Sequence, residues 1–269
     1  MELPILKLAE EKGLDLAFAN DLDLDANTPQ IKNATTLVLG GHAEYWTNNM
    51  RENLQSAIDR GTNLINFGGN AGYNRMRLEN DGQIAMWRRT KSDPFKDVPD
   101  KVTTAWRMPP ISKPESLLLG SQYIGLGVSG DFKIVHPTRW PFNAMKSPDI
   151  LKLVVGREVD SPLYSPGPAV ESLATSEIKV HGVPATAMAT YYNAKSGAGV
   201  LDIGTNGWPC AMANICPWHE NVPLNVREDI RAVTMNILTG ASYGPLAKKY
   251  PAVTDIPART KTSKFNPQS

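Results

Sequence analysis

The first 70 residues alternate between segments with helical spacing of apolar side chains and segments typical of buried strands. Residues 3–12 place their leucines and isoleucine near one side of a helix, and Gly13 follows as a C-terminal stop. Residues 14–19 alternate apolar and polar side chains and predict a short strand. The continuous apolar run at 35–39 predicts a buried strand, closed by two glycines.

A strand–helix–strand unit follows from the next segment. Thr47 can cap a helix that runs to about Arg60, and residues 63–67 form the next apolar run, again closed by glycines. This pattern is typical of a doubly wound, mostly parallel α/β sheet. We therefore expect residues 35–39 and 63–67 to be adjacent parallel strands, with the loops 40–47 and 68–77 at their carboxyl ends, where such sheets bind ligands.

The rest of the chain is predicted to complete one α/β domain over residues 1–245. The segment from about 80 to 185 contains short strand-like runs and many prolines, and we interpret it as a loop- and strand-rich elaboration packed on the sheet. Beyond it the pattern predicts three elements: strands at 185–192 and 199–203 and an amphipathic helix at 225–238. Residues 246–269 are expected to form an extended C-terminal arm.

Composition and charge exclude several classes of partner. The 269 residues contain 28 Lys and Arg against 27 Asp and Glu, so the net charge of +1 gives no electrostatic case for nucleic acid or an anionic membrane. No stretch reaches the about 20 apolar residues of a membrane helix, and nothing at the N-terminus resembles a signal peptide. We expect a cytoplasmic protein in which Cys210 and Cys216 are free thiols.

Candidate chemistry lies in the two loops after the predicted parallel strands. The first loop contains His42, Glu44, Tyr45 and Trp46. Loops at strand ends often carry function, but Glu44 could equally favour a helix N-terminus while the aromatic residues cover the edge of the core. The second loop begins Gly-Gly-Asn and contains Tyr73. It lacks the Lys-Ser/Thr of a phosphate-binding loop, and a turn that needs positive φ is the alternative interpretation.

Glu158 follows a third apolar run and is a further candidate, although a carboxylate in such a position is usually solvated. The chain has neither a GxSxG nor an HExxH motif, which argues against a serine nucleophile and against that class of zinc protease.

Several of these segments together resemble a known family, that of the C-terminal domain of the N,N-dimethylformamidase large subunit. The family's H-x-E-Y-W/H loop matches His42, Glu44, Tyr45 and Trp46. Its G-G-N-x-x-Y-x-R segment matches Gly68, Gly69, Asn70, Tyr73 and Arg75, and its G-x-E-x-D step matches Gly156, Glu158 and Asp160. The resemblance extends over most of the chain, to about residue 245.

The resemblance implies a class I glutamine-amidotransferase-like (flavodoxin-like) fold without its catalytic cysteine. It also implies a mononuclear Fe(III) site with Tyr45, Tyr73 and Glu158 as ligands, a donor set of hard oxygens that suits this ion. The family's first strand usually precedes the helix that begins here at Leu3. From the resemblance we therefore expect a chain that either is shortened before that strand or uses another element in its place.

Two classes of function remain open. The first is a metal-dependent amidohydrolase-like enzyme acting on a small amide, in which His42 or Glu44 holds or deprotonates water and Asn70 orients a ligand. Such an enzyme would be a homo-oligomer, with a possible small subunit as partner. The second is a non-catalytic ligand-binding or structural module, which could be carbohydrate-related if Trp106, Trp140, Trp208 and Trp218 stack on sugars.

Overall fold

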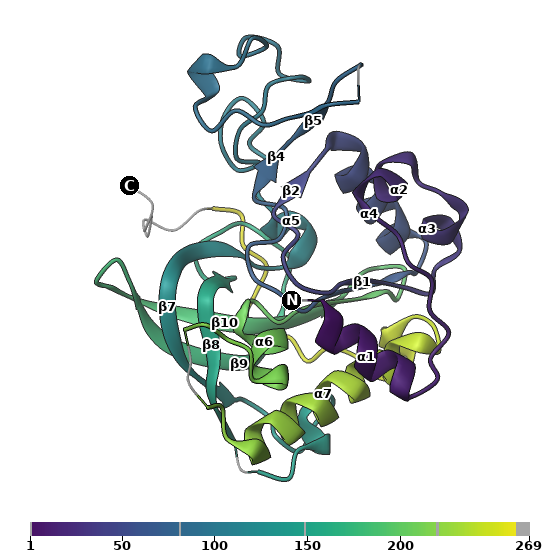
Figure 1. Cartoon of the computed structure of the whole chain (residues 1–269), viewed down its shortest axis with the longest axis vertical. Coiled ribbons are helices and arrows are strands. Elements are labelled where there is room, and N and C mark those ends of the chain that lie inside the picture. The colour runs from purple at the N-terminus through teal and green to yellow at the C-terminus, as the bar shows by residue number, and fades with distance from the viewer. Residues whose placement is uncertain (1, 81, 148, 219–220, 262–269) are drawn as a thin grey trace.

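A seven-stranded mixed sheet forms the centre of the molecule (Figure 1). The computed structural model describes residues 2–80, 82–147, 149–218 and 221–261. Met1 and the last eight residues of the predicted C-terminal arm, 262–269, lie outside the described residues. The strands follow the order β1 (Thr36–Leu39), β3 (Asn63–Asn66), β11 (Gly199–Asp202), β10 (Val183–Asn193), β9 (Glu171–Val180), β7 (Gln122–Ile134) and β8 (Ile150–Ser161).

The predicted strand–helix–strand unit is confirmed. β1 and β3 are adjacent and parallel, with Leu37 opposite Leu64, and α4 (Asn48–Asp59) connects them. Thr47 caps this helix by accepting a hydrogen bond from the Met50 backbone N–H at 3.1 Å. β11 continues the parallel part of the sheet on the other side of β3.

The expectation of a doubly wound, mostly parallel, flavodoxin-like sheet is wrong. The four longest strands, β7 to β10, pair antiparallel and curl into a half-barrel (Figure 1). Register shifts interrupt the β7–β8 pairing, and Leu153 and Arg157 adopt positive φ in β8. These irregularities interrupt the alternation of apolar and polar residues by which a strand is recognised in sequence. For this reason the sequence pattern predicts only short strand-like runs in this region.

Helices cover both faces of the sheet. Inside the curl lie α1 (Leu3–Glu11), α6 (Gly207–Ala213) and α7 (Leu224–Ser242), packed in one apolar core with β7 and β8. The opposite core contains α2 (Asp21–Ala26), α3 (Pro29–Asn33), α4 and α5 (Ser116–Leu119). Successive side chains of β3 point to opposite faces of the sheet, so Leu64 packs in one core and Ile65 in the other.

Smaller elements complete the chain. β2 (Tyr45–Trp46) and β4 (Asn74–Arg75) form a short parallel pair that joins the two candidate loops, and β5 (Arg77–Leu78) pairs with β6 (Ile84–Ala85) in the projecting upper lobe (Figure 1). The single-turn helices are η1 (Thr90–Ser92), η2 (Phe142–Ala144) and η3 (Leu246–Lys248). After η3 the chain runs back along the sheet, where Ile256 bridges to Val170 and Arg259 to Gly167.

Two further expectations are wrong. Residues 14–19 form no strand, because residues 15–19 are exposed and have no ladder partner; Phe18 is 64% exposed. Cys210 and Cys216 are joined in a disulfide, not free, because the end of α6 turns back and brings their Cα atoms to 4.9 Å. Among the described residues, no helix is both long and apolar enough to cross a membrane.

Candidate functional site

Three loops and one distant strand converge at the carboxyl ends of the parallel strands. The loops after β1, β3 and β11 lie at the same sheet edge because these strands are parallel. The curl of the half-barrel then returns β8 to this edge, where Val159 bridges to Thr205. The Asn206 backbone N–H donates to the Glu158 carbonyl at 3.2 Å. This closure places the side chain of Glu158 against the loops from the first half of the chain.

The first two glycines of the second loop, Gly68 and Gly69, allow this close approach. A Cβ at Gly68 would overlap the carbonyl of Gly41, and a Cβ at Gly69 would lie 2.8 Å from the carbonyl oxygen of Glu158. Neither of these two glycines has positive φ, whereas Asn70, at φ 61°, and Gly72, at φ 65°, do, so the interpretation as a turn that needs positive φ holds at Gly72. The Gly-Gly-Asn sequence is therefore explained by backbone-to-backbone packing around the site.

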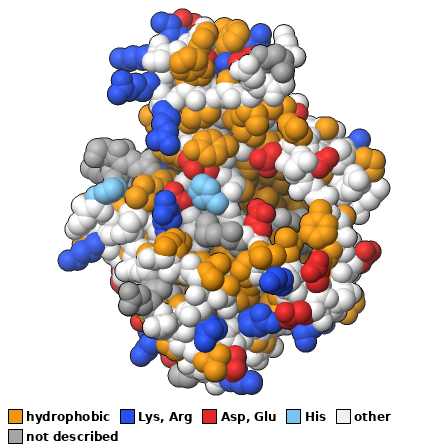
Figure 2. Space-filling view, in the orientation of Figure 1, with side chains coloured by type: hydrophobic (Ala, Val, Ile, Leu, Met, Phe, Trp, Pro, Cys, Tyr) orange, Lys and Arg blue, Asp and Glu red, His pale blue; other side chains and the backbone are white. Residues whose placement is uncertain are grey.

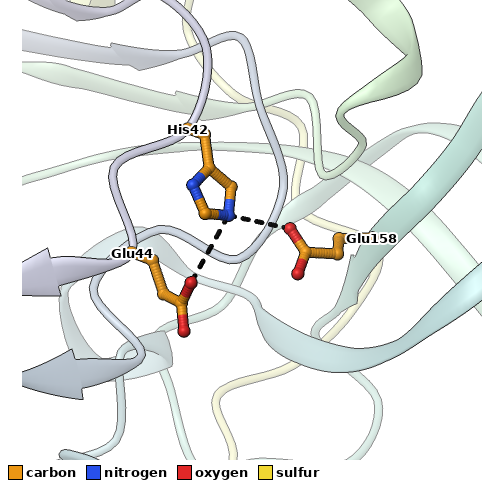
Figure 3. A group of neighbouring side chains, drawn as sticks. All are labelled: His42, Glu44 and Glu158. Atoms are coloured by element: carbon orange, nitrogen blue, oxygen red, sulfur yellow. Dashed lines mark hydrogen bonds and ion pairs between the residues drawn. The ribbon is translucent and has the colours of Figure 1, made fainter.

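His42, Glu44 and Glu158 form a compact polar cluster (Figure 3). Nε2 of His42 lies 2.8 Å from Oε2 of Glu158 and 3.5 Å from Oε2 of Glu44. These three atoms all lie within 4.8 Å of one another. Figure 2 shows acidic side chains and a histidine in the hollowed middle of this face, below the upper lobe.

Three asparagines hold the carboxylates in place. Asn70 donates from Nδ2 to Oε1 of Glu158 at 3.2 Å, and Asn206 donates to Oε2 at 2.6 Å. Asn74 donates to Oε1 of Glu44 at 2.7 Å. Asn70 and Asn74 belong to the segment after β3, and Asn206 belongs to the loop after β11. These donors fix the orientations of both carboxylates before any ligand binds.

The cluster has a distinct charge pattern. The hydrogen bond with Glu158 raises the pKa of His42, against an opposing effect of burial. Burial alone would raise the pKa of Glu158, but its hydrogen bonds with His42, Asn206 and Asn70 outweigh burial and lower it. Burial raises the pKa of Glu44, only partly opposed by His42 and Asn74. Glu158 is therefore the more firmly ionised carboxylate, and Glu44 the one that accepts a proton more readily.

The two candidate tyrosines belong to the segments that follow β1 and β3. Burial raises the pKa of both phenols, and the negative charge of Glu44 raises it further. Tyr45 is partly exposed, and its side chain hydrogen-bonds with those of Glu44 and Arg88. Tyr73 packs edge-to-face on Tyr123, with ring centroids 5.3 Å apart. The structure thus joins His42, Glu44, Asn70 and Glu158 by direct contacts, and Tyr45 contacts this group through Glu44.

Two buried acidic residues, Asp160 and Asp202, hold the backbone and side chains behind the cluster. The sequence pattern did not identify Asp202 as part of the site. Oδ1 of Asp160 accepts the Asn70 backbone N–H at 2.8 Å, and Oδ1 of Asp202 accepts Nδ2 of Asn66 at 2.8 Å. Burial raises the pKa of Asp202 to about 6 and raises that of Asp160 as well. One signal was available in the sequence: Asp202 ends a strand at the same sheet edge as the candidate loops.

Comparison with known proteins agrees with these local features. Residues 1–221 match the family model described as N,N-dimethylformamidase beta subunit-like, C-terminal. No curated protein matches the chain significantly. The matched region contains the loops after β1, β3 and β11 together with β8, that is, every residue of the cluster. The chain therefore belongs to the N,N-dimethylformamidase beta subunit-like C-terminal family.

Proposed function

We propose that this chain hydrolyses the C–N bond of a small amide with the help of a mononuclear Fe(III) ion bound at the cluster. The observation that carries the proposal is the convergence of His42, Glu44 and Glu158 at the carboxyl ends of the parallel strands. Membership of a dimethylformamidase-related family supports amide hydrolysis as the reaction class.

The side chains at this position suit a cation. One imidazole nitrogen and two carboxylate oxygens within 4.8 Å are donors that first-row metal ions accept. Asn70 is 2% exposed, yet its Oδ1 has no hydrogen-bond partner among the described residues, so this buried acceptor also faces a missing donor or cation. Glu158 belongs both to this cluster and to the Tyr45, Tyr73 and Glu158 set implied by the family resemblance. It is therefore the ligand that we assign first.

The side chains around the ion have separate tasks in this proposal. When bound, the ion supplies Lewis acidity for the amide carbonyl and for water. Glu44, with its raised pKa, takes a proton from the attacking water at Oε2 and returns it to the leaving nitrogen as the C–N bond breaks. His42 keeps Glu44 and Glu158 at a fixed separation, and Oδ1 of Asn70 accepts a hydrogen bond from the substrate or the attacking water.

Metal content and colour test the proposal. Protein purified without chelators should contain about one iron per chain, as one cluster predicts, and phenolate ligation would add a visible charge-transfer band. Glu158→Gln should abolish iron binding whichever set holds the ion. Tyr73→Phe should remove iron and colour only if the phenolate set holds it, and His42→Gln only if the imidazole set does. Glu177→Gln and Tyr243→Phe, which change exposed residues of the same types, serve as matched controls.

Activity is then measured on a panel of small amides that includes N,N-dimethylformamide and formamide. We expect the iron-loaded protein to release amine or ammonia. Glu44→Gln should lose turnover in either case, and it should retain iron only if the phenolate set holds the ion. Wild-type protein that binds no iron after reconstitution and hydrolyses none of the amides would contradict the proposal.

A carbohydrate-related module receives no support from three of the four candidate tryptophans. Trp106 and Trp208 are 2% and 0% exposed, so neither presents a ring face to a sugar. Trp140 is stacked on Tyr250 at 4.4 Å between centroids.

Because the family is described as beta subunit-like, we propose that the chain works within an assembly, either a homo-oligomer or with a smaller subunit. Light scattering of the purified chain, alone and with candidate subunits, tests this.

A further inference from the structure

A mostly buried ion pair outside the cluster contacts Tyr73. The guanidinium of Arg107 lies 5.0 Å from the centroid of the Tyr73 ring and forms a salt bridge with Glu115, whose side chain is 0% exposed. Nη2 of Arg107 also donates to the backbone carbonyl of Tyr123 at 2.9 Å. Since Tyr123 packs edge-to-face on Tyr73, the tyrosine ring is held between a cation on its face and a second ring.

The backbone delivers Arg107 to this position. Residues 104–106 run antiparallel to residues 73–75, with the Trp106 N–H donating to the Tyr73 carbonyl at 2.8 Å and Asn74 bridged to Ala105. Arg107 is the next residue along this segment. The pairing of these two backbone segments therefore places Arg107 next to Tyr73.

Stability alone does not explain this pair. Burying two charges is costly, and replacing such a pair by apolar side chains of similar volume is often neutral or stabilising. The guanidinium instead bonds to both carboxylate oxygens of Glu115 and to a backbone carbonyl, which fixes its plane, and leaves its flat face to the phenol ring.

The pair also connects Tyr73 to the strand that carries Glu158. Tyr123 is the second residue of β7 and lies opposite Asp160 of β8, two residues after Glu158. We propose that the Arg107–Glu115 ion pair is a positioning unit that sets the orientation of the Tyr73 ring relative to Glu158. The role rests on the proposed function, because it concerns a side chain beside the proposed metal site.

Two sets of variants test the unit. Arg107→Lys keeps the charge but lacks the planar group that stacks on Tyr73. The double variant Arg107→Met, Glu115→Leu removes both charges together, so neither partner of this pair is left buried alone. Arg51, on which the charge of Glu115 also acts, keeps its hydrogen bond to the Pro114 carbonyl, so the chain should still fold. The matched control is Arg51→Lys, because Arg51 is likewise a buried arginine over an aromatic ring, 4.9 Å from the centroid of Trp106.

Two measurements are made on each variant. The first is iron affinity by competition with a chelator, for which we expect a loss of about 10- to 100-fold in both Arg107 variants and none in Arg51→Lys. The second is the near-ultraviolet circular dichroism of the metal-free protein, with the Tyr73 contribution assigned from Tyr73→Phe. We expect the Arg107 variants to lose this contribution and to show no further change when Tyr73→Phe is added.

The outcomes separate this inference from the proposed function. Arg107 variants that keep both the wild-type iron affinity and the wild-type tyrosine signal would overturn the positioning role, whatever the protein hydrolyses. If the wild-type protein binds no iron, the proposed function fails and the tyrosine signal alone decides. A lost Tyr73 signal in folded Arg107→Lys then supports the unit, and a retained signal refutes it.

Discussion

Asn206 offers the sharpest test of how the site is held together. Its side chain is buried, donating from Nδ2 to Oε2 of Glu158 at 2.6 Å and accepting the Gly69 backbone N–H at Oδ1 at 2.8 Å. It therefore links the loop after β3 to the carboxylate on β8. Asn206→Ala removes both links without adding bulk.

The expected cost follows from the two contacts. Loss of a hydrogen bond to a charged group costs about 1.5–3 kcal/mol, and the Gly69 N–H left without an acceptor costs about 1–3 kcal/mol more. Together they lower the free energy of unfolding by about 2.5–6 kcal/mol. In a domain of this size that corresponds to a fall in Tm of at least about 5 °C. The pKa of Glu158 should rise at the same time, because one of the donors that lowers it is gone.

Asn206→Asp separates the two links. The carboxylate still accepts the Gly69 N–H, but it repels Glu158 at neutral pH. Its Tm should therefore recover as the pH falls and one of the two carboxylates becomes protonated, while the Tm of Asn206→Ala should not recover. Urea unfolding and calorimetry of the metal-free proteins measure both effects. An Asn206→Ala protein with the Tm of wild type would refute the reasoning.

Two further predictions concern charge and the disulfide. In metal-free protein, His42→Gln should destabilise most between the unfolded-state pKa values of 4.5 for Glu158 and 6.5 for His42. The difference in Tm between wild type and His42→Gln should fade above this window, as the pH passes the raised pKa of His42. It should also fade below the window, as the pH passes the lowered pKa of Glu158. A difference in Tm that does not depend on pH would contradict this reasoning. Cys216→Ser opens a loop closed across six positions and should cost about 2 kcal/mol, whereas a wild-type Tm insensitive to reductant would count against the disulfide.

The predictable part of the fold was the part with regular local patterns. The runs at 35–39 and 63–67 are continuous and end in glycines, so the parallel β1–β3 unit could be predicted from its own residues. The antiparallel half-barrel could not, because β7 and β8 are interrupted by register shifts and by left-handed residues such as Arg157. The disulfide was missed because it depends on the turn after α6.

The candidate site shows the same division. His42 and Glu44 could be found from their place after a predicted strand, whereas Glu158 became a strong candidate only through the family resemblance. Asn206 gave no signal, because its role arises from a contact with a residue 48 positions away. Residues whose importance comes from long-range pairing are not visible in a single sequence without the fold.

The separation between the two halves of the cluster has a consequence for folding kinetics. His42 and Glu158 are 116 residues apart in the chain, and they meet only after the half-barrel has closed on the loop that follows β11. Contacts of such high sequence separation form late and slow the search for the native state. An intermediate with only the β1–α4–β3 unit formed would therefore lack the site, and in a refolding experiment the recovery of metal affinity should lag behind the recovery of helical circular dichroism.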